Sequence, residues 1–493
     1  MLLRARMIAL AAVFLLFASP ANAANGIWSS TVRLPNYTYA VSLITGPDGN
    51  LWFSDFYPFA GGTGYIVRLD SRGNTTYFEM PNFSSFQGPV PTLSMALTNV
   101  PPSVGGAPRQ LAFNWIAYNA ATQVVIESGL GTIDVDSPPR VKEYAGQNPG
   151  DPLYSARTTL EPIAFNLSST NSPPQVLGYA HARPSESSSQ ELVVGIPFPF
   201  TRNAVQTTIP ISGETAANYS LLDNIFTGAD GNTWFQGAGA IGQISPSGAR
   251  EFPLPAGPNA LTASSTALWA SAFNQTYPFL GSLEIAYDGS AQAFFPAPAL
   301  FFDWEIIAAT PDALWGLSFD TTIPVIYFMR MSPIGQWSAY PVQSPLGIGV
   351  RPFITTLMAA PDGTIWAGVS NPDVAPGVSR LMSFRSNRVL SALPTQLTLS
   401  AGRSTMVRVH ETNYASLRFT SSLPSNCPLA VTPGGSPGSF VVAATSNSGT
   451  GCGVTFTDSD GISVWVPVTL SSPQGSKYQV RPKIQRLTVF GHS

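Results

Sequence analysis

The residues best suited to do chemistry are four carboxylates that come just before the expected innermost strands of a repeated β-structure. They are Glu161, Asp223, Asp303 and Glu305. Carboxylate oxygens are the ligands that hard cations such as Mg²⁺ and Ca²⁺ prefer. If the repeats form a ring and these side chains converge on its centre, two overlapping sites are expected. The metal site would be Glu161, Asp223 and Asp303, and the ligand-binding site Asp223, Asp303, Glu305 and Asn259. The alternative is that these residues are solvated carboxylates at loop ends.

Other catalytic groups are scarce in this sequence of 493 residues. It contains three histidines, at 181, 410 and 492, and three lysines, at 142, 477 and 483. It has no Walker-type phosphate loop. Histidine acid–base catalysis, histidine-rich metal sites and lysine chemistry are therefore not expected.

A repeated motif predicts the elements that must position the carboxylates. Gly46-Pro-Asp-Gly-Asn-Leu-Trp-Phe53 recurs as Gly228-Ala-Asp-Gly-Asn-Thr-Trp-Phe235 and, more weakly, as Ala360-Pro-Asp-Gly-Thr-Ile-Trp366. Asp-Gly forms tight turns between antiparallel strands, and the tryptophan begins the next strand. The spacing of the later tryptophans is close to the period of a four-stranded propeller blade. We count seven units, at about 41–81, 92–146, 158–210, 221–255, 259–298, 305–342 and 354–393.

Two further segments complete the expected all-β fold, a seven-bladed β-propeller followed by a small immunoglobulin-like β-sandwich. Residues 29–35 resemble an outer strand without a unit of its own, and can close the ring by pairing with the last unit. Residues 394–470 contain short strands typical of the sandwich. The propeller would then span 24–393, and residues 471–493 would be a flexible basic tail.

The two cysteines, Cys427 and Cys452, both fall in the expected sandwich. An even number of cysteines in an exported chain indicates a disulfide, here between these two. Zinc binding is the alternative, but neither a second cysteine pair nor a histidine cluster accompanies them.

The first residues and the charge predict where the protein is found. Two arginines, an apolar run and Ala21-Asn22-Ala23 are typical of a signal peptide over 1–23. Its removal takes two of the 24 basic residues and none of the 27 acidic ones, so the net charge changes from −3 to −5. A nucleic-acid partner is therefore not expected.

The sequence has no later apolar run long enough to span a membrane. We expect a monomer that is secreted, periplasmic or at the cell surface.

The motif at 46–53, with Ile241-Gly-Gln-Ile-Ser-Pro-Ser-Gly248 and Glu251-Phe-Pro-Leu-Pro255, resembles the streptogramin B (virginiamycin B) lyase family. The resemblance covers roughly residues 28–393 and implies a seven-bladed propeller. It also implies the opening of a cyclic lactone by elimination, with a histidine, a glutamate and a magnesium ion at the centre of the ring.

This sequence departs from the family at the catalytic histidine. The family's Arg-Pro-His-Gly-Ile segment corresponds to Arg351-Pro352-Phe353-Ile354. The equivalent positions in other units hold Val41, Asp223, Pro258 or Asn259, and Asp303 or Trp304. An elimination needs a base within reach of the abstracted proton. The sequence therefore favours a protein that binds a small molecule, glycan or peptide. The alternatives are a metal-assisted carbon–oxygen lyase or related envelope enzyme that uses the acidic residues with Mg or Ca, and a structural or adhesive surface protein.

Overall fold

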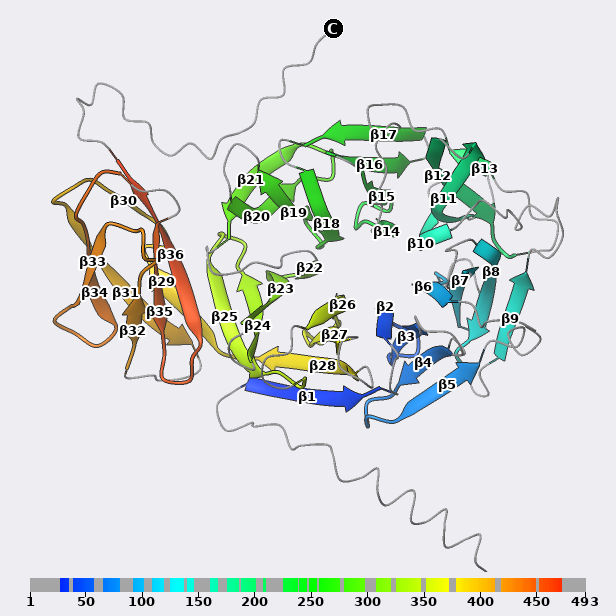
Figure 1. Cartoon of the computed structure of the whole chain (residues 1–493), viewed down its shortest axis with the longest axis horizontal. Helices are drawn as coiled ribbons and strands as arrows, with labels where there is room; N and C mark the ends of the chain where they lie inside the picture. Colours follow the sequence, from blue (N-terminus) through cyan, green and yellow to red (C-terminus); the bar gives the residue numbers. More distant parts are fainter. Residues whose placement is uncertain are drawn as a thin grey trace, which may run out of the picture.

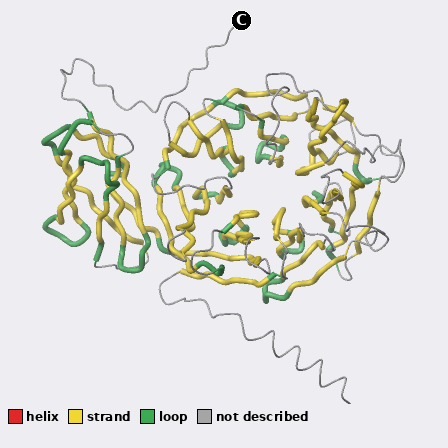
Figure 2. The backbone as a smooth tube through the Cα atoms, viewed as in Figure 1, coloured by secondary structure: helices red, strands yellow, loops and turns green. Residues whose placement is uncertain are grey.

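The computed structural model describes 22 segments of the chain. They are residues 27–34, 39–56, 65–79, 92–101, 109–118, 125–136, 140–145, 160–166, 175–185, 188–200, 207–209, 225–237, 239–245, 248–254, 257–274, 279–297, 307–320, 325–346, 352–371, 378–412, 418–448 and 452–471. These segments are built from strands, turns and loops (Figure 2). They include no helix of the length and apolar character needed to cross a membrane. The expected signal peptide and nearly all of the expected tail lie outside these segments.

Antiparallel sets of four strands follow one another round a ring, which gives the chain an all-β, propeller-like fold (Figure 1). We name each set, or ring sheet, after its first strand. In the first half of the ring the strands are β2 (Tyr39–Thr45), β3 (Leu51–Phe56), β4 (Tyr65–Leu69) and β5 (Thr75–Glu79); β6 (Thr92–Asn99), β7 (Gln110–Tyr118), β8 (Val125–Asp134) and β9 (Arg140–Ala145); β10 (Leu160–Asn166), β11 (Gln175–Ser185), β12 (Ser188–Pro197) and β13 (Thr207–Ile209).

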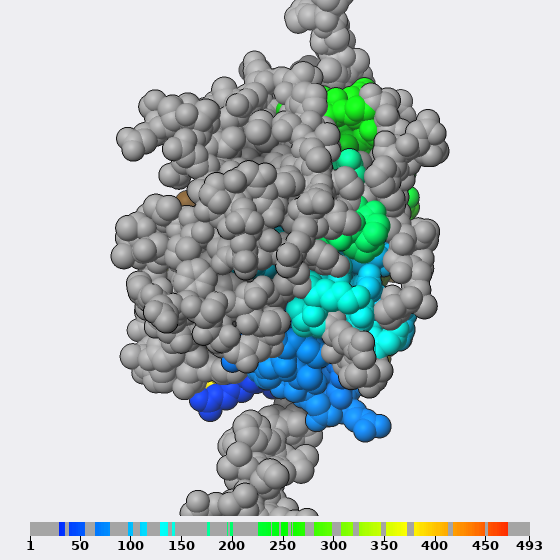
Figure 3. All heavy atoms as spheres, turned by 90° about the vertical axis from the view of Figure 1, so that its right-hand side faces the viewer, coloured from blue at the N-terminus to red at the C-terminus, as the bar shows by residue number. Residues whose placement is uncertain are grey.

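The second half of the ring repeats this order. Its strands are β14 (Ile225–Thr227), β15 (Thr233–Gln236), β16 (Ala240–Ser245) and β17 (Gly248–Pro253); β18 (Gly257–Ala263), β19 (Leu268–Asn274), β20 (Phe279–Ile285) and β21 (Ala291–Pro296); β22 (Ile307–Thr310), β23 (Ala313–Asp320), β24 (Val325–Met331) and β25 (Trp337–Gln343); β26 (Phe353–Ala359), β27 (Ile365–Asn371) and β28 (Val378–Ser386). The first strand of each sheet lies nearest the centre of the ring (Figure 1). In the side view, the described residues run from blue through cyan to green, so the sheets follow one another in chain order (Figure 3).

Strand β1 (Ile27–Arg33) closes the ring by completing the β26 sheet. It pairs antiparallel with β28, from Ile27 opposite Ser386 to Arg33 opposite Arg380. Position 30 adds a contact between the Ser30 and Ser383 hydroxyls at 2.6 Å. The expected pairing of the N-terminal strand with the last unit is therefore confirmed. The sheet holds together residues that are about 350 positions apart in the chain.

The repeated motif forms the turn between the first and second strands of a ring sheet. Gly49 has a φ of 78° and Gly231 a φ of 77°, a conformation that favours glycine. The Asp48 carboxylate accepts a hydrogen bond of 2.9 Å from Trp52 Nε1, and Asp230 accepts one of 3.1 Å from Trp234 Nε1. Both indoles are fully buried. The aspartate of the motif thus satisfies the one polar atom of a buried tryptophan.

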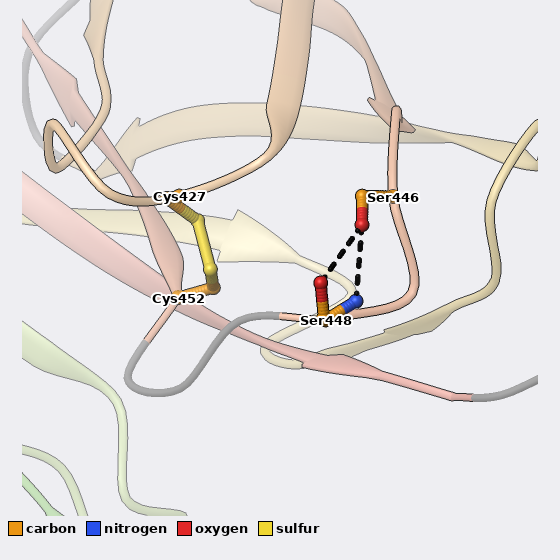
Figure 4. The surroundings of a disulfide bond; sticks show 4 residues. All are labelled: Cys427, Ser446, Ser448 and Cys452. Carbon is orange, nitrogen blue, oxygen red and sulfur yellow. Dashed lines mark hydrogen bonds between the residues drawn. A yellow bond between two sulfur atoms is a disulfide. The ribbon is translucent and has the colours of Figure 1, made fainter.

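The C-terminal part packs two layers of strands beside the ring (Figure 1). One sheet has the order β29 (Val389–Leu393), β31 (Ser404–Thr412), β34 (Ser439–Ala444) and β33 (Leu429–Pro433). The other contains β36 (Ser463–Leu470), β35 (Gly453–Thr457) and β32 (Thr420–Ser422), with β30 (Leu397–Leu399) parallel to β36. Cys427 and Cys452 form a disulfide with their Cα atoms 5.2 Å apart (Figure 4). The predicted cysteine pairing is present in the structure.

The boundary between the two parts differs from the one read in the sequence. Residues 389–393, counted with the last repeat unit, pair with β31 of the C-terminal sheet instead. The outer position of the last ring sheet is already filled by β1. Strand β36 also pairs with β25, so the β22 sheet continues into the C-terminal part through Trp337 opposite Trp465. A single hydrophobic core extends from the β22 and β26 sheets into both C-terminal sheets.

Candidate functional site

Four innermost strands change register close to their first residues. The shifts fall between Val41 and Ile44 in β2, Leu160 and Ile163 in β10, Pro258 and Ala260 in β18, and Ile354 and Thr356 in β26. Bulges of this kind re-aim side chains and are common beside binding and catalytic sites. Two candidate residues from the sequence, Glu161 and Asn259, lie within these shifts on the backbone. Their side chains are outside the described part of the structure.

The proposed convergence of carboxylates stays a prediction. Asp223, Asp303 and Glu305 lie outside the described segments, and only the backbone of Glu161 is described. Within the described segments, no group of three or more histidine, cysteine, aspartate or glutamate residues is placed to hold a metal ion.

Two described side chains at the bulges tie neighbouring innermost strands together. The Ser42 hydroxyl in β2, a residue with a φ of 50°, accepts a hydrogen bond of 2.7 Å from the Leu97 amide in β6. The Thr355 hydroxyl in β26 donates one of 2.5 Å to the carbonyl of Ala40 in β2. The bulges therefore connect three consecutive innermost strands and fix the inner face of the ring.

Buried polar residues on the second strands of two ring sheets donate hydrogen bonds to backbone carbonyls at the bulges. Ser54 donates to the Val41 carbonyl at 3.2 Å, and Gln236 Nε2 donates to the Pro258 carbonyl at 3.0 Å. Sequence reasoning missed this layer, although a signal exists. A polar residue stands two positions after the motif tryptophan, as in Trp52 and Ser54, or Trp234 and Gln236.

Another group of residues begins at Phe353, the first residue of β26. The resemblance to the lyase family implies a histidine at this position. Phe353 is 48% exposed and stands opposite Ser370 of β27, which stands opposite Ser379 of β28. We call these three residues the Phe353 row. The Ser370 and Ser379 side chains are buried, and neither hydroxyl has a hydrogen-bond partner in the described structure. The hydroxyls of Thr132, Thr233 and Ser271 are in the same state, so the exposed ring of Phe353 is what distinguishes this row.

The Phe353 row faces the first ring sheet. Directly opposed residues of an antiparallel sheet share one face, and so do residues two positions apart in a strand. Gly368 therefore shares the face of Ser370, and a Cβ at Gly368 would lie 2.9 Å from the Ala40 carbonyl of β2. The row thus lies where the last and first ring sheets meet.

A second group of charged residues lies at the seam between the ring and the C-terminal part. Arg388 is fully buried; its Nε lies 2.6 Å from Glu411, its Nη2 2.5 Å from Asp458 and its Nη1 2.8 Å from Asp460. Its backbone carbonyl accepts a hydrogen bond of 3.0 Å from the Tyr340 hydroxyl. We call these residues the Arg388 cluster.

Burial governs the pKa values in the Arg388 cluster. It raises the pKa of the Glu411 and Asp458 carboxyls, against the opposing effect of the Arg388 charge. It also raises the pKa of Tyr340 to about 12. Because the Arg388 guanidinium is enclosed by its partners, this cluster holds two parts of the protein together and offers no open position to a ligand.

Comparisons with known proteins do not identify a family. No protein-family model and no curated protein matches the chain. Among solved structures, BBS1N in complex with ARL6DN, soaked with lead, is 12% identical, with a TM-score of 0.30 over 66% of this chain and 92% of that one. The S. cerevisiae core factor is 11% identical, with a TM-score of 0.39 over 76% and 64%.

A third similar structure is the extracellular domain of the putative hybrid two component system BT4673 from B. thetaiotaomicron. It is 11% identical, with a TM-score of 0.25 over 85% of this chain and 69% of that one. The description of the fold therefore rests on the strand pairing of this chain itself.

Proposed function

We propose that the protein is a secreted or surface-exposed binding protein that takes a small molecule, glycan or peptide at the Phe353 row. In this proposal the ring sheets are the blades of a seven-bladed propeller related to the streptogramin B lyase group. The C-terminal part is an immunoglobulin-like sandwich. The observation that carries the proposal is an exposed aromatic ring in one row with two buried hydroxyls that have no partner among the described residues.

The chemistry of the row suits binding better than elimination. A phenyl ring cannot accept a proton, whereas its face can stack on a sugar or on another ring. The Ser370 and Ser379 hydroxyls are buried in the same row, so the exposed face of Phe353 is the part of the row that a ligand contacts. Bulges and buried polar residues hold the surrounding innermost strands in place before any ligand arrives, which lowers the entropic cost of binding.

The test compares two exposed apolar side chains. Purified protein is applied to a glycan and peptide array, and the affinity for any hit is measured for the wild type, Phe353→Ala and Ile334→Ala. Ile334 is 68% exposed and lies in the turn between β24 and β25, away from the innermost strands. Loss of an aromatic anchor should cost about 2 kcal/mol, roughly 30-fold in affinity. Ile334→Ala should bind like the wild type. Equal binding by Phe353→Ala would contradict the proposal.

A further inference from the structure

Two arginines stand directly opposite each other where the ring closes. Arg33 is the last residue of β1, and it pairs with Arg380 of β28. Opposed residues of an antiparallel pair project from the same face of the sheet. Like charges in this arrangement are destabilising unless something of opposite charge offsets them.

Arg380 is a half-buried cation with no acidic partner among the described residues. It stands opposite Val369, a fully buried residue of the core that the ring shares with the C-terminal part. Burial lowers the pKa of Arg380, and the charge of Arg33 lowers it further. In the described structure its guanidinium makes one hydrogen bond, of 2.8 Å, from Nη1 to the Ser379 carbonyl. A guanidinium carries five N–H donors, so most of them are left for another partner.

The other arginines of the described structure show that a partly buried arginine without a neighbouring carboxylate is unusual in this protein. Among the arginines whose side chains are described, the least exposed are Arg68, Arg330, Arg380 and Arg388. Arg68 lies 4.0 Å from Asp48, Arg330 lies 3.0 Å from Asp312, and Arg388 contacts three carboxylates. In this set, Arg380 alone has no carboxylate beside it. The chain pairs its partly buried arginines with acids everywhere in the described structure except at the ring closure.

We propose that Arg380, with the charge of Arg33 beside it, binds an oxyanion: the carboxylate or phosphate group of a ligand. The planar donor fork of a guanidinium matches two oxygens of either group. The site is distinct from the Phe353 row, because Arg380 follows Ser379 in β28 and projects from the opposite face of the sheet. A bound anion offsets the effect of the Arg33 charge on Arg380 and supplies a partner for the half-buried guanidinium.

The experiment measures thermal unfolding of the full chain in sodium chloride, sodium acetate and sodium phosphate at one ionic strength. Four proteins are compared: the wild type, Arg380→Gln, Arg380→Lys and Arg385→Gln. Arg385 is an exposed arginine of the same strand, so its variant makes the same change of charge outside the site. The wild type and Arg385→Gln should show a saturable rise in melting temperature with acetate, phosphate or both.

Arg380→Gln should weaken the apparent affinity by about 10-fold or more, and Arg380→Lys should fall between it and the wild type. A rise with phosphate alone assigns the site to phosphate groups, and a rise with acetate to carboxylates. The absence of a saturable rise in the wild type, or an equal rise in Arg380→Gln, would overturn the proposal.

The melting temperature of the same variants in chloride is a second readout. It distinguishes an anion-binding arginine from one that only packs against its neighbours. In chloride, Arg380→Gln should melt at a higher temperature than the wild type, because it removes a half-buried charge that has no acidic partner in the described structure. If Arg380 served only packing, this variant would melt at a lower temperature in every salt, and the proposal would be wrong.

Discussion

Replacing Arg388 with methionine should destabilise the protein more than any other single arginine substitution in the described structure. The side chains of Arg388, Glu411 and Asp458 are at most 1% exposed, and the two ion pairs measure 2.6 and 2.5 Å. Methionine keeps much of the apolar volume but leaves both carboxyl groups without the cation. Breaking a buried pair by removing one partner typically costs about 3–5 kcal/mol. Asp460 is 24% exposed and can be solvated, so it adds little.

The loss should depend on pH in a defined direction. Burial already raises the pKa of Glu411 and Asp458 in the folded protein, and removal of Arg388 raises both further. A carboxyl whose pKa is raised on folding stabilises the fold at low pH, and that stability is lost as the pH rises through its folded-state pKa. The destabilisation by Arg388→Met should therefore be largest at neutral and alkaline pH. It should shrink in acid, where the carboxyl groups are protonated.

Thermal unfolding followed by circular dichroism at pH 5 and pH 8 measures both effects. We expect a melting temperature lower by on the order of 5 °C at pH 8, with a smaller difference at pH 5. Arg385→Met is the matched control, because Arg385 is exposed on the same chain segment. A change of less than about 1 kcal/mol, as for a surface ion pair, would refute the burial argument. A loss that does not vary with pH would refute the assignment to the two carboxyls.

Two other outcomes follow from the ring. Deleting residues 27–33 should lower the melting temperature sharply, because β28 becomes an open edge and the β26 sheet loses its outer strand; an unchanged melting temperature would show that β1 does not close the ring. Purified protein incubated with a streptogramin B and magnesium should give at most a trace of linear product by chromatography, since Phe353 cannot serve as the base that contributes about 10²–10⁴-fold. Turnover that Asp223→Asn abolishes would instead assign the base to that aspartate.

The sequence predicts those parts of the fold that have a local signal. Asp-Gly before a tryptophan identifies the first turn of a ring sheet, and at Asp48 and Asp230 the aspartate accepts a hydrogen bond from the indole of the buried tryptophan. The strand before the first repeat could be assigned to the ring closure because it had no other partner. The cysteine pairing could be predicted because the chain contains only two cysteines.

The features that sequence reasoning missed are contacts between distant residues. Arg388 follows Ser386-Asn387 and looks like an exposed turn residue, while its acidic partners stand at 411, 458 and 460. The Asp458-Ser-Asp460-Gly461 segment forms the turn between β35 and β36, with Asp458 accepting from the amides of Asp460 and Ile462. The same turn supplies two carboxylates to Arg388, which lies 70 positions before Asp458. No local sequence pattern predicts this contact.

The sequence predicts which residues begin the innermost strands, but it does not predict the bulges and hydrogen bonds that shape them. Counting back from the motif tryptophans reaches Asn259 and Phe353, and both lie at the start of innermost strands. The bulges that shape these strands depend on hydrogen bonds across neighbouring sheets, such as Thr355 to Ala40, and these require the closed ring. The unpartnered hydroxyls of Ser370 and Ser379 likewise become evident only once the register of β27 and β28 is known.

The contacts between the ring and the C-terminal part also stabilise the β26 sheet, in which both proposed sites lie. Strand β36 covers the edge of β25, and one core joins the β22 and β26 sheets to the C-terminal sheets. An edge that is paired and a core that is shared oppose the opening of this sector of the ring. Phe353 and Arg380 lie in the sheet that borders this sector and is itself closed by β1. The ring closure and the shared core should therefore lower the entropic cost of binding a ligand at this sheet.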